Sequence, residues 1–209
     1  MRKAVFAVAV VVLAMISVSA AKAETVLYST WGSFANPGAG FTIANVAAPG
    51  GISTIHDGGA NGSTITFSGA SSAEIDSPTI NPLGVFTTTV PIKKGEIDTY
   101  TGTTFTLTID QLSPTTGIGT IVGTLSGTLR KSAKGIGASS LELAWSDHFV
   151  TLGGVTYTPV DLEIAGATLT TDTTLQGNIT AVPVPASAMG GMGLFALIGS
   201  WKLIRRRSA

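Results

Sequence analysis

Two histidines each stand next to an aspartate, and both pairs could contribute to a metal site or a catalytic triad. His56 precedes Asp57, and His148 follows Asp147. Zinc requires three or four ligands in register, but the sequence does not constrain the distance in space between these pairs. A serine nucleophile would need a sharp Gly-x-Ser-x-Gly turn to present it, and the chain has no such stretch. We therefore interpret both histidines as polar loop residues and predict no metal site.

Three pairs of carboxylates are spaced two residues apart, which would place both acids of a pair on one face of a strand. A glycosidase needs two carboxyl groups across a cleft, and calcium needs a cluster of oxygen ligands. Solvated strand edges explain the pairs more simply, so we predict no catalytic residue and no cofactor. A secreted hydrolase stays as an alternative function. The pairs are Glu74 with Asp76, Glu96 with Asp98, and Asp161 with Glu163.

Aromatic side chains offer a different chemistry, because an exposed ring can stack on a sugar. Most of the aromatic residues fall in alternating stretches, where core packing is the default interpretation. Trp31 and Tyr100 are the exceptions, since both neighbour turn-like sequence. A carbohydrate-binding module for exopolysaccharide, with Trp31 and Tyr100 as ligand-binding residues, is therefore the first alternative function.

The elements that would position these residues are β-strands, because apolar and polar side chains alternate through the middle of the chain. In 104–110, Phe105, Leu107 and Ile109 face one way and threonines face the other. No window shows a sustained helical period with caps. The expected strands are Thr25–Ser29, Phe41–Ala47, Thr64–Ser68, Leu83–Val90, Thr104–Asp110, Thr120–Leu129, Leu141–Ser146, Val155–Tyr157, Val160–Ile164 and Leu175–Ala181.

Two irregularities are expected within these strands. The inward-facing apolar positions of 155–164 change parity at Pro159, which predicts a bulge or a switch between sheets. Gly123 and Gly127 lie on the inward face of 120–129 together with Leu125. Glycines at such positions predict a bend or a close approach of backbone.

Strands separated by Gly, Pro and Asn turn signals indicate an all-β body. We expect an antiparallel β-sandwich, jelly-roll-like in general shape. A barrel is the alternative, and the lack of a fixed-period repeat disfavours a solenoid. Helix is expected only at the two termini, as an N-terminal signal helix and a C-terminal membrane helix.

The first 23 residues have the pattern of a secretory signal peptide. A basic start is followed by the unbroken apolar run Ala4–Ile16 and then by small residues. Ala21 and Ala23 fit the A-x-A cleavage pattern. We expect export by the Sec machinery and cleavage before Glu24, with a retained N-terminal anchor as the alternative.

The predicted body, residues 24–181, is long enough for one domain with its own core. The whole chain has 12 basic and 12 acidic residues, but only five of the basic ones lie in the body, which leaves it at about −7. An acidic body is repelled by nucleic acid and by anionic lipid, so no nucleic-acid partner is expected. The chain has no cysteine, which excludes thiolate metal sites and cysteine catalysis.

The last 28 residues, 182–209, have three parts in a fixed order. Paired prolines force an extended head that cannot join a helix or a sheet ladder. A largely apolar run of sixteen residues, Ala186–Trp201, follows and would span about 24 Å as a helix, less than the roughly 30 Å hydrocarbon core of a bilayer. A cationic end then stops transfer, because buried cations are costly and positive charge is retained on the cytoplasmic side. The head is Val182, Pro183, Val184, Pro185 and Ala186, and the cationic residues are Lys202, Arg205, Arg206 and Arg207.

This tail resembles the PEP-CTERM sorting signal of Gram-negative bacteria, which has a Val-Pro-x-Pro head, a short Gly/Ala/Leu-rich membrane segment and an Arg-rich end. The commonest form has Glu at the third head position, where this chain has Val184; the head resembles the variants that carry an apolar residue there. The resemblance covers about an eighth of the chain. It implies transient attachment to the inner membrane, recognition and removal of the tail by an exosortase, and delivery to the cell surface or an extracellular polymer matrix such as a biofilm. An ordinary C-terminal transmembrane anchor is the alternative.

The body does not resemble any enzyme family, and the residues above give it no catalytic centre. The sequence therefore predicts a non-enzymatic exported protein, sorted by its tail, whose body contributes adhesion or structure.

Overall fold

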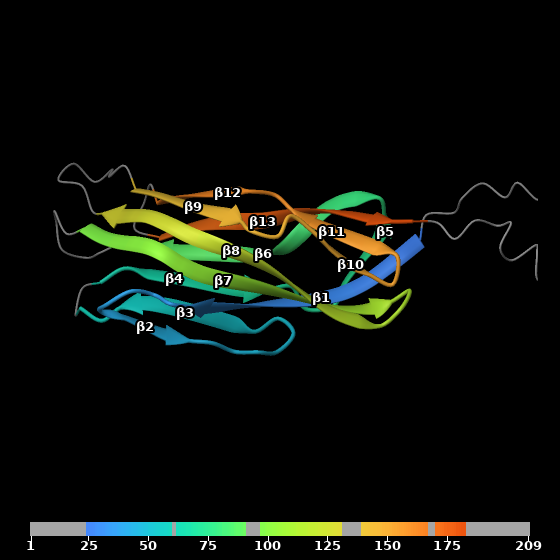
Figure 1. The fold of residues 1–209 in the computed structure, drawn as a ribbon, viewed down its shortest axis with the longest axis horizontal. Coiled ribbons are helices and arrows are strands. Elements are labelled where there is room, and N and C mark those ends of the chain that lie inside the picture. The colour runs from blue at the N-terminus through green and yellow to red at the C-terminus, as the bar shows by residue number, and fades with distance from the viewer. Residues whose placement is uncertain (1–23, 60–61, 91–96, 131–138, 167–169, 183–209) are drawn as a thin grey trace, which may run out of the picture. The chain divides into compact units, whose positions relative to one another are not determined.

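The computed structural model describes residues 24–59, 62–90, 97–130, 139–166 and 170–182. All the regular elements within these ranges are β-strands, numbered β1 to β13 in chain order. Residues Glu24–Ala181 form one compact unit, and its strands run along the long direction of the view in Figure 1.

Six strands form one antiparallel sheet, called here the six-stranded sheet. Its longest pairing joins β7 and β8 in a hairpin whose register runs from Ile97 opposite Arg130 to Gln111 opposite Gly117. In order across the sheet, the strands are β12 (Leu162–Gly166), β9 (Ser139–Trp145), β8 (Gly117–Arg130), β7 (Ile97–Ser113), β1 (Glu24–Ala35) and β5 (Ala73–Ser77).

The other seven strands form a second antiparallel sheet, called here the seven-stranded sheet. It contains β10 (Val150–Leu152), β11 (Val155–Pro159), β13 (Thr170–Ala181), β6 (Thr79–Thr89), β4 (Thr64–Gly69), β3 (Ile52–Asp57) and β2 (Phe41–Ala44), in that order. The two sheets pack against each other (Figure 1). The prediction of an all-β body with two packed antiparallel sheets is therefore confirmed, while the predicted terminal helices fall outside the described residues.

Each expected strand has a counterpart in the structure, and the change of parity at Pro159 has a clear meaning. Up to Pro159 the chain belongs to β11 of the seven-stranded sheet, and from Leu162 it belongs to β12 of the six-stranded sheet. The predicted sheet switch is confirmed. At Gly127, where φ is +135°, an added Cβ would overlap the carbonyl oxygen of Ser140 on β9, which confirms the predicted close approach of backbone.

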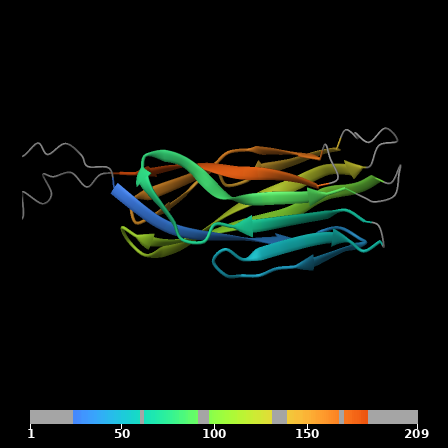
Figure 2. The same ribbon diagram turned by 180° about the vertical axis from the view of Figure 1, so that it is seen from behind.

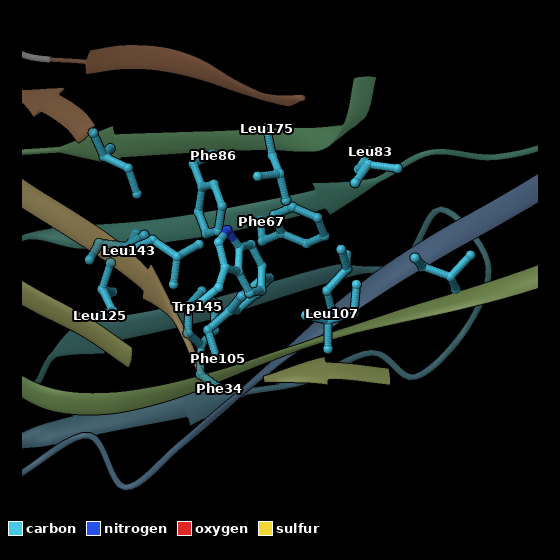
Figure 3. Close-up of a cluster of buried hydrophobic side chains, with 14 of the residues drawn as sticks. Phe34, Phe67, Leu83, Phe86, Phe105, Leu107, Leu125, Leu143, Trp145 and Leu175 are labelled. Carbon is cyan, nitrogen blue, oxygen red and sulfur yellow. The ribbon is translucent and has the colours of Figure 1, made fainter. Parts of the chain in front are cut away.

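The core between the sheets is centred on an aromatic cluster (Figure 3). The ring centroid of Phe105 on β7 lies 4.9 Å from that of Phe67 and 5.0 Å from that of Phe86, and both of these residues are on the opposite sheet. Phe34 and Trp145 flank it at 5.2 and 6.1 Å. Phe105, Phe67 and Phe86 are fully buried, so this cluster joins the two layers. Trp145, which lies in the alternating stretch 141–146, is 6% exposed, in agreement with core packing as the default for aromatic residues in such stretches.

The second half of β1 has no strand partner on one side, because β5 pairs only with Glu24–Tyr28. Side chains from the seven-stranded sheet and its loops satisfy the backbone there instead. The side-chain amide of Asn45 accepts a hydrogen bond from the Phe34 N–H and donates one to the Phe34 carbonyl, both at 2.9 Å. The hydroxyl of Ser53 donates to the carbonyl of Gly32 at 2.6 Å. These bonds seal an edge that would otherwise expose unpaired backbone groups.

Both ends of the body lie at the same end of the strands, as Figures 1 and 2 show from opposite sides. Glu24 is the cross-strand partner of Ser77. The Ser77 hydroxyl accepts a hydrogen bond from the Ala181 N–H at 2.6 Å and donates one to the Ile179 carbonyl at 3.3 Å. The buried Ser77 of β5 therefore links β13 to the start of β1.

Candidate functional site

Trp31 is the one predicted binding residue that the structure leaves on the surface. It lies on β1, where the buried residues Thr30 and Gly32 on either side face inward and Trp31 faces outward, partly exposed. Its cross-strand partner is Thr108 on β7, which in turn pairs with Thr120 on β8. Hydroxyl groups therefore line this outer face beside the indole ring. Such a ring among neutral hydroxyls can stack on a sugar and leave the polar neighbours to bind its hydroxyl groups.

Tyr100 is not a surface residue, and its predicted role in ligand binding has to be corrected. Only 1% of its surface is exposed. Its ring packs 4.7 Å from that of Phe41, and its hydroxyl is hydrogen-bonded to that of Ser63 at 2.8 Å. The turn-like sequence after Tyr100 is a bulge inside β7, with Gly102 at a φ of +70°. A ring enclosed in this way cannot stack on a sugar.

Asp98 is also buried, at 6% exposure, whereas the sequence favoured a solvated strand edge. One of its carboxylate oxygens accepts a hydrogen bond from the Ser63 N–H at 2.6 Å. Because Ser63 also bonds to Tyr100, Asp98 and Tyr100 together hold the start of β4 against β7. This small network stabilises the fold, and its polar atoms face one another rather than solvent.

The other two carboxylate pairs lie as expected on the surface of the six-stranded sheet. Glu74 and Asp76 are exposed on β5, at one edge of that sheet. Asp161 and Glu163 are exposed at β12, on the opposite edge. Neither pair can face the other across a cleft, so this arrangement gives the hydrolase alternative no support. Glu96 lies outside the described residues.

The two histidines lie on different elements. His148 is exposed between β9 and β10, as predicted for a loop residue, and Asp147 beside it is exposed too. His56 instead lies in strand β3, where its Nδ1 is 2.8 Å from the Thr64 hydroxyl. In the ranges that the structure describes, no three His, Asp or Glu side chains gather as metal ligands would.

A buried polar network that the sequence analysis did not single out lies near Ala181. Gln111 continues the inward-facing row of Phe105, Leu107 and Ile109 and is fully buried. Its side chain accepts a hydrogen bond from the Tyr157 hydroxyl at 2.8 Å and donates one to the Thr115 carbonyl at 2.7 Å. The sequence contained a signal for this network: Gln111 occupies an inward-facing position of a strand, and a buried glutamine side chain requires hydrogen-bond partners.

All three tyrosines of the chain have a raised pKa. For Tyr28, Tyr100 and Tyr157 the largest cause is burial, which disfavours the charged phenolate. The nearby charges of Asp98 and Asp57 add to the effect at Tyr100. The folded state therefore retains these protons at a pH at which the unfolded chain releases them.

This difference predicts a loss of stability in alkali. The folded-state pKa values of the three tyrosines lie above the unfolded value of about 10. Their contribution to the free energy of unfolding is therefore complete below about pH 10 and falls as the pH rises above it. We expect the free energy of unfolding to be level from about pH 7 to 9 and to drop above about pH 10. Tyrosinate absorbance should rise together with unfolding. A gradual rise of that absorbance in a chain that stays folded would contradict the burial of the three tyrosines.

The residues predicted for sorting and cleavage lie almost entirely outside the described part of the chain. This holds for Ala21, Ala23, Pro183, Val184, Pro185, Ala186, Lys202, Arg205, Arg206 and Arg207. Val182 is described, and it is 63% exposed just after the end of β13. Within the described ranges, no helix has the length and apolar character that crossing a membrane requires.

Comparison with known proteins gives no family for this chain: no family model, no curated protein and no solved structure matches it.

Proposed function

We propose that this chain is an exported, non-enzymatic protein of the cell surface or extracellular matrix, sorted by its C-terminal tail and processed by an exosortase. The observation that carries the proposal is the order of the tail: a proline head, an apolar run and three arginines. Export by the Sec machinery, the signal helix at 1–23 and a brief stay at the inner membrane belong to the same proposal. So does a jelly-roll-like β-sandwich as the body.

The position of the chain ends supports this proposal. Ala181, from which the tail leaves, is bound to Ser77, whose strand partner is Glu24. The two segments that would be removed thus both begin at one end of the body. Cleavage at either end would leave the core intact, because the core residues lie between Val26 and Ala181.

Expression of the full chain in a host with and without an exosortase tests the sorting proposal. We expect the tail to be removed only where the enzyme is present. Replacing Pro183 and Pro185 by Ala should block removal, because the head would lose its extended backbone. Ser187→Ala is the matched control and should be processed normally. A tail that stays attached equally in both hosts would refute the proposal.

Binding of exopolysaccharide is a second candidate function of the body, and the surface position of Trp31 favours it. Trp31→Ala should weaken retention on an exopolysaccharide column about tenfold, equivalent to roughly 1.4 kcal/mol of lost stacking. Phe149→Ala is the control, since Phe149 is another aromatic side chain, 62% exposed in the connection between β9 and β10. Unchanged retention of the Trp31 variant, with an unchanged unfolding midpoint, would count against this function.

A further inference from the structure

The turn between β7 and β8 carries exposed apolar side chains beside it. Leu112 is 44% exposed and Ile118 is 66% exposed. Leu112 is the extra residue of a bulge between Gln111 and Ser113, where β7 pairs with β1, and Ile118 on β8 lies opposite Asp110. Moving these two exposed apolar side chains at the hairpin tip out of water would be favourable, because it removes apolar surface from contact with water. Neither side chain belongs to the buried core between the sheets.

This tip lies at the end of the body from which the tail emerges. Ala181 pairs with Val155 at the start of β11. The β10–β11 turn before Val155 packs on the tip, because a Cβ added at Gly153 would clash with the side chain of Thr115. Figures 1 and 2 both show the β7–β8 turn at the same end as the start of β1 and the end of β13.

The length of the tail head limits how far this end can lie from a membrane. Only Val182 to Pro185 separate Ala181 from the apolar run that begins at Ala186. A fully extended chain spans at most about 3.3–3.6 Å per residue, so these five steps reach about 17 Å. If the apolar run is in a bilayer, the tip is held close to the lipid surface.

We propose that the β7–β8 tip, through Leu112 and Ile118, inserts into the headgroup region of a zwitterionic lipid bilayer while the tail anchors the chain. This inference rests on the proposed membrane role of the tail. Two apolar side chains bind lipid weakly by themselves, but the tether raises their effective concentration at the surface. Asp110 opposite Ile118 disfavours anionic lipid, so zwitterionic lipid is the matching surface.

The chain has no cysteine, so a single introduced cysteine can carry an environment-sensitive fluorophore. We would label Ile118→Cys, Ile97→Cys and Ala196→Cys in the full chain, reconstituted in phosphatidylcholine vesicles with and without a lipid-borne quencher. Ile97 is the matched control, because it is the same residue type, is 53% exposed, and lies at the opposite end of β7. Ala196 reports on the tail.

We expect quenching lipid to roughly halve the fluorescence at 118 and at 196, and to leave that at 97 unchanged. Quenching at 196 without quenching at 118 would overturn the insertion of the tip and leave the tail proposal standing. No quenching at 196 would overturn the membrane role of the tail itself. Equal quenching at 97 and 118 would indicate general adsorption of the body and would also overturn the inference.

Discussion

Phe105→Ala is expected to lower the free energy of unfolding by about 3–5 kcal/mol, the usual result of emptying a large aromatic site in a core. Phe105 is fully buried and lies within 5.2 Å, between ring centroids, of Phe34, Phe67 and Phe86. Its removal would open a cavity where the two sheets meet. Because these three rings belong to β1, β4 and β6, in both sheets, they can collapse only partly into that space.

Denaturant unfolding of the variant and the parent chain measures this effect. Thr106→Ala is the control, because Thr106 is the next residue of β7 and faces outward, so it should change stability by less than about 1 kcal/mol. Equal effects of the two substitutions would show that the aromatic cluster does not join the sheets.

Ending the chain at Ala181 is expected to move all of the exported protein from the membrane fraction to the soluble exported fraction, in a host without an exosortase. The truncation removes the apolar run and the cations that we propose hold it across the membrane. The body should fold unchanged, since Val182 is exposed and β13 ends at Ala181.

Cell fractionation and blotting measure the distribution of the protein. The control replaces Arg205, Arg206 and Arg207 by Lys, which retains the positive charge and should keep the protein at the membrane. A truncated chain that still sediments with membranes would place the anchor elsewhere, and a soluble Lys variant would show that charge is not what stops transfer.

The strands could be predicted because alternation reports directly on burial. In 104–110 the residues with inward parity are those that form the core, and the same rule correctly assigns Leu125, Leu143 and Trp145. Pro159 was informative because proline has no N–H to donate to a neighbouring strand. A change of the inward-facing positions from odd to even numbers at this residue therefore marks the place where the chain passes from one sheet to the other.

Other features depend on partners that are distant in the sequence. Strand β3 was missed because one of its inward-facing residues, Ser53, is polar. The Ser53 hydroxyl donates a hydrogen bond to the Gly32 carbonyl on β1 of the other sheet. The burial of Asp98 and Tyr100 depends on Ser63, 35 and 37 residues away. In the candidate site, the sequence pattern could not show which way Trp31 faces. Ser29 and Thr30 are both buried in succession on β1, so inward and outward positions do not alternate there, and the orientation of Trp31 becomes clear only with the neighbouring strand.

Mass spectrometry of the mature protein, recovered from the cells that make it, tests the sorting proposal most directly because it determines both ends of the chain. We expect a polypeptide that begins at Glu24 and ends before Lys202, recovered from the surface or the medium. A cytosolic chain that begins at Met1 and still carries Arg205, Arg206 and Arg207 would contradict it.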